Sequence, residues 1–416
     1  MSSIVPRRFR VVGATCDDAV VTHHISDEQR RIRLARRHAI HPQHRVHDPV
    51  AATHAMTVLH ATEAASVHLS VQARVDDVSV DDIERALYDD RSLVKQLAMR
   101  RTLFVFPRDL LPAAWGSASA RVAATELRRL AQDVEKAGVA DDGTAWVDAA
   151  VAQVVAHLSD ERALDVTALR AALPDLQSRI TFGSGKWTQE GPVAPRVVTV
   201  AGARGDVVRG ENAGHWRVSK PHWTSMARWL GEQVRPLDEA AGYAELVRRW
   251  LATFGPGTET DIVWWLGATK SAVRRALTDV GAVAVGLDSG DTGYVLPDDL
   301  DADEPVEEWA ALLPTLDPTS MGWKQRDFYL DPDDVPYLVD RAGNIGTTAW
   351  WNGRVVGCWV QDDDARVTVV VRNPEKLPAA ALRALEAQAD RLTDWLDGVV
   401  VNTVYASPQM KGLAPS

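Results

Sequence analysis

The sequence predicts an α+β protein built from tandem winged-helix (helix-turn-helix) units, with a C-terminal β-rich section, and three observations support this. Two stretches pass through three short helical patterns and then into a pair of strand-like segments, which is the outline of a winged helix. A third stretch repeats this outline more weakly. The final section contains mainly strand-like apolar runs, followed by one amphipathic helix.

These patterns divide the chain into five sections. We expect a loose N-terminal tail over residues 1–25, winged-helix units over 26–130, 146–235 and 238–300, and the β-rich section with its terminal helix over 308–416. Polar segments at 130–145 and 298–308 are expected to be linkers.

The first unit is predicted from capping and periodicity. Asp48 and Pro49 form an N-cap and first-turn pair before an apolar helical pattern that runs to residue 61. Two more short helices are expected over 65–75 and over 79–90, the latter capped by its first serine. Residues 93–107 are rich in branched and aromatic side chains and predict paired strands.

The third unit shows the clearest signals. An amphipathic helix is expected over 241–255, and Thr258 with Asp261 forms a capping pattern for the second helix. A third helix ends at Gly281, and residues 282–297 predict a hairpin around a Gly/Asp-rich turn.

The remaining elements are predicted from weaker patterns. In the middle unit we expect helices over 146–158 and 165–174 and a hairpin over 204–218. In the last section, strand patterns flank a turn at Asn352-Gly353, and the terminal helix is expected over 377–396.

The net charge is unevenly distributed. The 416 residues carry a net charge of −11, and the stretch from Asp279 to Asp317 alone holds eleven acids and no Lys or Arg. The rest is therefore neutral overall, with basic clusters over 30–37 and 179–228. We expect a bipolar molecule whose acidic side faces solvent or a partner and whose basic side faces nucleic acid.

Several site classes are not expected. Cys16 and Cys358 lie far apart, so neither a disulfide framework nor a cysteine-rich zinc site is predicted. Four histidines recur at every third position from His38 to His47, but Pro42 interrupts any helix that would align them, so we expect no metal and no cofactor. No apolar run is long enough to cross a bilayer, so we expect no contact with the membrane. The low cysteine content fits a reducing cytoplasm. We further expect a monomer that is associated with the nucleoid.

Winged helices commonly place their second helix-turn-helix helix in the DNA major groove. In the third unit Lys270 and Arg274 share a face of that helix, but the adjoining hairpin carries acids and no cation. The middle unit is the better candidate for phosphate contact, with Arg196, Arg204, Arg209, Arg217 and Lys220. Winged helices also serve as protein–protein modules, and arginine-rich helices are often simply solvated, so these alternatives stay open.

Several segments resemble a known family. They include RLARRHAI, HDPVAATHAMTVLHATEAASVHLSVQAR, ERALYDDRSLVKQLAMRRTLFVFP, YAELVRRWLATFGPGTETDIVWWLG, LLPTLDPTSMGWKQRD and NGRVVGCW. Together they resemble the AlkZ/YcaQ-type winged-helix DNA glycosylases over nearly the whole chain after about residue 28. The resemblance implies a C-shaped body that grips duplex DNA and excises alkylated or otherwise damaged bases without a metal. Family members carry Gln-x-Gln or Gln-x-Asp where this chain has His60-Ala61-Thr62.

His60 and Thr62 are the first catalytic candidates. Side chains two residues apart share a face only in extended backbone, so joint action requires the preceding helix to end near Leu59. Neutral His60 can accept a proton from water, the Thr62 hydroxyl can hold that water, and Glu63 supplies a neighbouring carboxylate. The alternative is that His60 is a structural histidine near a helix end.

Asp317 is the second candidate, because the resemblance places a recurring Leu-Pro-x-x-Asp-Pro segment here. It would supply the carboxylate that the His-x-Thr motif lacks, close to Lys324 and Arg326. An Asp-Pro pair is also commonly just a turn. Arg100 and Arg101 are expected to contact phosphates beside an extruded nucleotide, or else only to pair with Asp89 and Asp90.

The sequence therefore predicts a monofunctional DNA repair glycosylase that binds damaged double-stranded DNA and hydrolyses the N-glycosidic bond of an alkylated or deaminated base. The main alternative is a non-catalytic winged-helix DNA-binding protein, either a regulator or a damage sensor. A third class is a protein-interaction scaffold that uses the acidic stretch.

Overall fold

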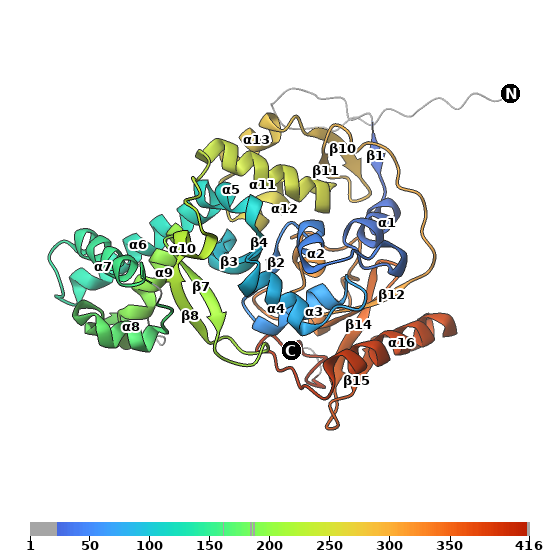
Figure 1. Cartoon of the computed structure of the whole chain (residues 1–416). Helices are drawn as coiled ribbons and strands as arrows, with labels where there is room; N and C mark the ends of the chain where they lie inside the picture. The colour runs from blue at the N-terminus through green and yellow to red at the C-terminus, as the bar shows by residue number, and fades with distance from the viewer. Residues whose placement is uncertain (1–22, 161, 184, 186–187, 414–416) are drawn as a thin grey trace.

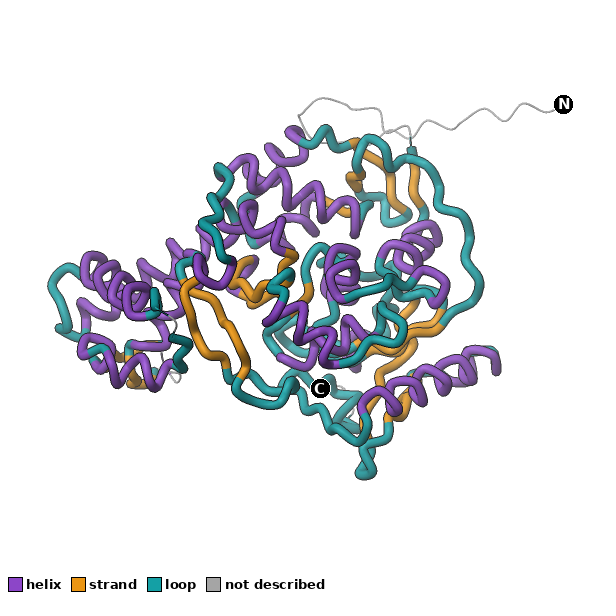
Figure 2. Tube along the Cα trace, in the orientation of Figure 1, coloured by secondary structure: helices purple, strands orange, loops and turns teal. Residues whose placement is uncertain are grey.

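The structure is a computed structural model that describes residues 23–160, 162–183, 185 and 188–413. Helices occur together with small, mainly antiparallel sheets, as expected for an α+β protein (Figures 1 and 2). Most of the tail predicted over 1–25 lies outside the described residues. Its last two residues form a short strand, β1 (His24–Ile25), which pairs in parallel with a strand of the third unit.

The first section holds short helices around a three-stranded sheet. In chain order its elements are α1 (Asp27–Arg37), α2 (Pro49–Ala55), β2 (Leu59–His60), α3 (Ala64–Gln72), α4 (Val80–Glu84), β3 (Leu93–Ala98) and β4 (Thr102–Pro107). The capping carboxylate of Asp48 accepts a hydrogen bond from Ala51 N at 2.7 Å and fixes the start of α2. The sheet order is β2-β4-β3, so the predicted hairpin is present with an additional strand beside β4.

The second section begins with a short helix and a long one that the sequence pattern did not predict. Its elements are α5 (Leu111–Gly116), α6 (Ala118–Lys136), α7 (Gly143–His157), α8 (Val166–Ala172), β5 (Arg179–Phe182), β6 (Gln189–Pro192), α9 (Ala194–Arg204), β7 (Val207–Asn212), β8 (Pro221–Ser225) and α10 (Met226–Leu230). The linker expected over 130–145 is wrong in its first half, because α6 continues to Lys136 and buries Leu130 and Val134. The second hairpin strand begins at Pro221, beyond the predicted 204–218.

The third section follows the predicted order of helix, helix-turn-helix and hairpin. It consists of α11 (Glu239–Phe254), β9 (Gly257–Thr258), α12 (Glu259–Leu266), α13 (Lys270–Asp279), β10 (Val283–Leu287) and β11 (Thr292–Val295). Thr258 and Asp261 form the predicted capping box at the start of α12. The sheet order is β1-β10-β11-β9.

The C-terminal section is an antiparallel four-stranded sheet with one long helix against it. Its elements are β12 (Ala310–Leu313), α14 (Pro318–Met321), α15 (Val335–Leu338), β13 (Thr348–Trp351), β14 (Arg354–Gln361), β15 (Val367–Val371) and α16 (Ala379–Leu396). Asn352 and Gly353 have φ of 47° and 79°, the left-handed values that the predicted tight turn between β13 and β14 requires.

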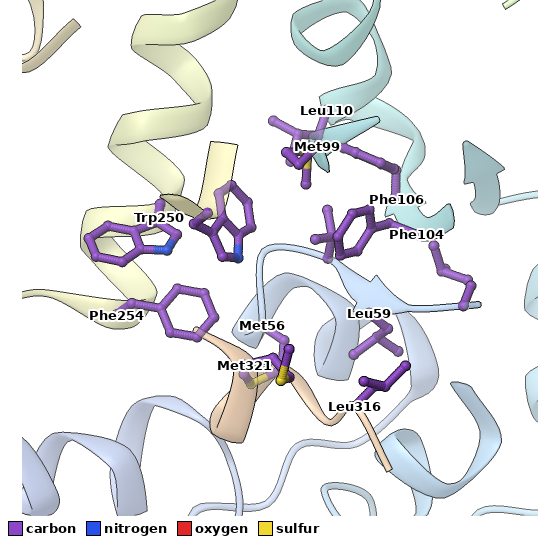
Figure 3. Packing of buried hydrophobic residues seen from close by; sticks show 14 of the residues in the cluster. Met56, Leu59, Met99, Phe104, Phe106, Leu110, Trp250, Phe254, Leu316 and Met321 are labelled. Carbon is purple, nitrogen blue, oxygen red and sulfur yellow. The ribbon is translucent and has the colours of Figure 1, made fainter. Parts of the chain in front are cut away.

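The largest hydrophobic core joins the first, third and C-terminal sections. In Figure 3, Met56 of the first section and Met321 of the C-terminal section lie between Phe254 of α11 and Leu59. The second section has a separate core between α6, α7 and α9, and α7 and α8 lie at one end of the molecule while α16 lies at another (Figure 1). No helix among the described residues is long and apolar enough to span a membrane.

The predicted bipolar charge distribution is wrong for the basic cluster over 30–37. Arg33 and Arg37 of α1 form ion pairs with Asp299 and Asp303 of the acidic stretch, at 2.6–3.1 Å. The 298–308 segment has no helix or strand, as expected of a linker, but it is held against α1. The cluster therefore neutralises part of the acidic stretch and is not a free basic surface.

Candidate active site

His60 lies on β2, at the point where the chain leaves the three-stranded sheet. α2 ends at Ala55, four residues before β2 begins, and His60 pairs with Phe104 of β4. Ala61 N donates to Leu103 O at 2.9 Å, so the pairing continues one residue further. The backbone is therefore extended through Ala61, which is part of the condition for residues 60 and 62 to share a face, but Thr62 lies in the following bend and is exposed while His60 is buried.

The His60 side chain is buried and lacks a hydrogen-bond partner on one ring nitrogen. The residue is 6% exposed, its ring lies 4.9 Å from that of Phe104, and its Nδ1 has no partner among the described residues. Burial, together with the positive charge of Arg100, lowers the pKa of His60 to about 3, and the negative charge of Asp317 only partly opposes this. His60 is therefore neutral at pH 7, and its weakly basic ring suits hydrogen bonding better than proton transfer.

Thr62 and Glu63 occupy a bend between β2 and α3. Thr62 is exposed, whereas Glu63 is turned toward the C-terminal segment. Glu63 Oε1 accepts hydrogen bonds from Thr403 Oγ1 at 2.8 Å and from Val404 N at 2.7 Å. Burial raises the pKa of Glu63 above its usual value despite these two hydrogen bonds. The carboxylate is thus held in place by the far end of the chain.

Asp317 is fully buried at the N-cap of α14 and forms an ion pair with fully buried Arg74. Arg74 donates to both carboxylate oxygens, at 2.7 and 2.9 Å, and Ser70 Oγ and Thr319 N donate to them as well. Burial alone would raise the pKa of Asp317, but Arg74 and these donors lower it overall. Both oxygens are occupied and no part of the side chain is exposed, so the geometry favours a structural role for Asp317 over the catalytic role expected from the sequence.

Arg100 and Arg326 converge on one tryptophan ring beside this buried network. Arg100 lies in the turn between β3 and β4 with a φ of 54°, and its guanidinium lies 4.0 Å from the centre of the Trp264 ring. The Arg326 guanidinium lies 5.5 Å from the same ring. Burial and Arg326 lower the pKa of Arg100 to about 10, so it stays charged at neutral pH. Among the predicted site residues, His60 thus lies within electrostatic range of Arg100 and Asp317, and Arg100 lies within electrostatic range of Arg326.

The segment that carries Arg326 is anchored by Asp261. This fully buried carboxylate caps α12 through Oδ2 and accepts hydrogen bonds at Oδ1 from the backbone N–H groups of Lys324 and Gln325, at 2.9 Å each. The Lys324 side chain is exposed. The capping pair predicted from sequence therefore also positions the Arg326 loop.

The other predicted DNA-binding residues are spread over the second section. Arg196 and Arg204 of α9 form ion pairs with Asp133 and Asp148, and Arg209 of β7 lies over the ring of Trp223. Arg217 and Lys220 are exposed in the loop between β7 and β8, where Arg217 donates to Val400 O at 2.7 Å. Arg101 forms an ion pair with Glu126 at 2.9 Å, not with Asp89 or Asp90.

Comparison with known proteins identifies the family. A family model described as DNA glycosylase AlkZ-like matches residues 53–395. The chain belongs to the AlkZ-like DNA glycosylase family. The fold is similar to that of the Streptomyces sahachiroi DNA glycosylase AlkZ, with 21% sequence identity, a TM-score of 0.68, and coverage of 91% of this chain and 98% of that chain. No curated protein sequence matches.

Membership of the AlkZ-like family makes this protein a DNA glycosylase of DNA repair, with DNA as its substrate. The matched range includes His60, Arg100 and Asp317. Among the described residues no group of three or more His, Cys, Asp or Glu side chains is arranged to hold a metal ion.

Sequence reasoning missed further cations beside Arg100 and Arg101. Arg121 and Arg129 of α6 line a hollow of about 290 Å³ together with Arg100 and Arg101. Their spacing of eight residues places them near one face of a helix, so the signal existed, but no helix was predicted over 108–129, the segment before the expected linker. Arg74 could not have been found as the partner of Asp317, because nothing local in the sequence links them.

Proposed function

We propose that this glycosylase binds duplex DNA and hydrolyses the N-glycosidic bond of a damaged base, with His60 and Thr62 at the reacting centre. The observation that carries the proposal is the buried Nδ1 of His60, which has no partner among the described residues and lies in the electrostatic field of Arg100. An unpaired buried nitrogen costs roughly 1–3 kcal/mol, and a ligand that donates a hydrogen bond to it would remove this cost.

The proposed reaction is hydrolysis at the sugar C1′. The bond between C1′ and the base nitrogen breaks with its electron pair passing to the base, and a water oxygen bonds to C1′ and loses a proton to the surrounding solvent. Neutral His60 accepts a hydrogen bond from this water through Nδ1, and the Thr62 hydroxyl gives a second contact from the exposed side.

The low basicity of His60 favours one class of lesion. A histidine with a pKa of about 3 orients water but removes its proton poorly. Hydrolysis then depends on a base that is already a good leaving group, and an alkylated purine, which carries a positive charge, meets this condition better than a deaminated base. We therefore place alkylated purines before uracil and hypoxanthine as substrates.

Duplex binding is proposed to use cations that have no carboxylate partner among the described residues. Arg100 acts electrostatically on His60, and Arg326 approaches the same Trp264 ring as Arg100. Lys324 is exposed in the segment that carries Arg326, and Arg209, Arg217 and Lys220 are proposed to extend the surface along the second hairpin. Arg101 is half exposed, and we keep it as a proposed DNA contact despite its ion pair with Glu126. Arg196 and Arg204 contribute less, because acids already neutralise them. We further propose that the protein acts as a monomer in the cytoplasm, associated with the nucleoid.

The test is a lesion screen. Duplex oligonucleotides that carry one alkylpurine, uracil or hypoxanthine are incubated with the protein and then treated with alkali, which breaks the strand wherever a base has been removed. Strand breaks are expected at the alkylpurine, and a lesion-free duplex of the same sequence is the control. Salt-dependent duplex binding without strand breaks at any lesion would favour a non-catalytic damage sensor instead.

A further inference from the structure

A second polar cavity lies where the β3–β4 hairpin meets α9 and the β7–β8 hairpin. It has a volume of about 200 Å³, and its wall includes Lys95 of β3, Arg101 of the hairpin turn, and Arg209 and Trp223 of the second hairpin. The strands that carry these residues, β3, β7 and β8, lie close to one another (Figure 1). The cavity therefore lies at the junction of the first and second sections.

The cavity is not part of the His60 site. His60 and Gln96 both pair with Phe104 of β4, so their side chains lie on one face of the sheet. Lys95 pairs with Val105, and its side chain therefore points to the opposite face. The two sites are separated by the sheet itself.

Two cations of the cavity lack a counter-charge. Lys95 Nζ donates to the Tyr88 hydroxyl at 2.7 Å and lies over the Tyr88 ring, but no carboxylate of the described residues is within ion-pair distance. The Arg209 guanidinium lies 4.8 Å from the centre of the Trp223 ring and likewise has no carboxylate partner among them. The charge of Glu84 raises the pKa of Lys95 from a distance, without forming an ion pair with it.

Lys95 remains largely protonated at neutral pH. Burial and the positive charge of Arg209 lower its pKa to about 8, although Glu84 raises it somewhat. Burial also lowers the pKa of Arg209 below its usual value. Holding two like charges in a partly buried cavity is unfavourable unless a negative group joins them.

We propose that this cavity binds a phosphate group, held between Lys95 and Arg209 with Arg101 at its edge. The group belongs either to the DNA backbone, which rests on the proposed function, or to a small phosphate compound. Trp223 supports the Arg209 guanidinium by cation–π contact and so presents its N–H groups to the anion.

The first arm of the test uses inorganic phosphate and thermal unfolding of the full chain. A ligand that binds only the folded state raises Tm, so phosphate should raise the Tm of the wild type relative to chloride at equal ionic strength. Lys95→Met and Arg209→Met should lose this increase. Lys95→Met should still fold, because methionine fills a similar space and removes a buried charge. Lys376→Met, which alters an exposed lysine of the C-terminal section, is the matched control and should keep the increase.

The second arm measures how duplex binding depends on salt for the same variants. If a DNA phosphate occupies the cavity, each cavity variant should lower the slope of log K against log salt by about 1. If a small phosphate compound occupies it, the slope stays at the wild-type value while the Tm increase is lost. Cavity variants that match the wild type in both arms would overturn the proposal. Failure of the wild type to bind duplex DNA would refute the proposed function. The Tm measurements with phosphate would then still show whether the cavity binds a phosphate group.

Discussion

Replacing Asp317 by Asn separates the structural role of this residue from a catalytic one. Asn has nearly the same size and can still accept the hydrogen bond from Thr319 N, but it leaves fully buried Arg74 without a counter-charge. Removing one partner of a buried pair typically costs about 3–5 kcal/mol, and the retained cap hydrogen bond places this variant near the lower end. In a cooperative unit of about 150–250 residues, where each kcal/mol shifts Tm by about 2–4 °C, a loss of about 3 kcal/mol corresponds to a fall in Tm of roughly 6–12 °C.

Thermal unfolding monitored by tryptophan fluorescence measures the effect. The double variant Arg74→Met with Asp317→Asn should recover most of the lost stability, because the unpaired charge is removed while the cap is kept. The Tm should also depend on pH in the wild type: Arg74 keeps the pKa of Asp317 depressed, so this stabilisation is present above about pH 3.9 and is lost as the pH falls further. An Asp317→Asn variant as stable as the wild type but without excision activity would refute the structural role and restore Asp317 as a catalytic residue.

Two further predictions concern buried histidines and paired arginines. His38, His60 and His68 each have a pKa lowered to about 3, mainly by burial, so the unfolded chain binds more protons below about pH 6.5. Unfolding free energy should therefore decrease as pH falls from about 6.5 towards 3, by up to about 1.4 kcal/mol per pH unit for each histidine, and His68→Phe should give a shallower dependence in urea titrations. An unchanged dependence in that variant would contradict the assignment of a neutral, buried His68. Arg204→Gln should leave the salt dependence of duplex binding unchanged, because Arg204 is already paired with Asp148 at 2.6 Å, and a slope reduced by about 1 would show that it contacts a phosphate.

Local signals predicted much of the fold. Asp48, Ser79 and the Thr258/Asp261 pair cap helices as expected, and the Asn352-Gly353 turn connects two strands as its composition indicates. These features depend on hydrogen bonds within a few residues, which the sequence displays directly. The family resemblance was confirmed as well.

Long-range pairing accounts for what the sequence could not reveal. The apolar helical pattern from Asp48 continues to residue 61, yet Leu59 and His60 leave the helix to pair with β4. The arginines of α1 look like a free basic cluster until Asp299 and Asp303 are brought against them. In each instance a partner distant in sequence changes the role of a correctly recognised residue.

The candidate site was predicted in part. The sequence identified His60, Arg100 and Arg326, and the structure brings Arg100 within electrostatic range of both His60 and Arg326. It could not show that burial would make His60 a weak base, nor that the carboxylate of Asp317 would be fully occupied by Arg74. Burial and ion pairing depend on the packed tertiary structure, and a residue's type alone does not determine them.

The most direct test of the central claim is the rate of base excision by His60 variants under single-turnover conditions on an alkylpurine duplex. We expect His60→Ala to lower the rate at least about 100-fold. This is the lower end of the rate effect that a positioned side chain contributes when it interacts with the reacting water. His60→Gln introduces the glutamine that the family motif carries at this position. This variant should retain much of the rate, because the amide oxygen can still accept a hydrogen bond from water. Duplex affinity should stay the same in both variants. Full activity of His60→Ala at unchanged affinity would contradict the account and move the reacting centre away from His60.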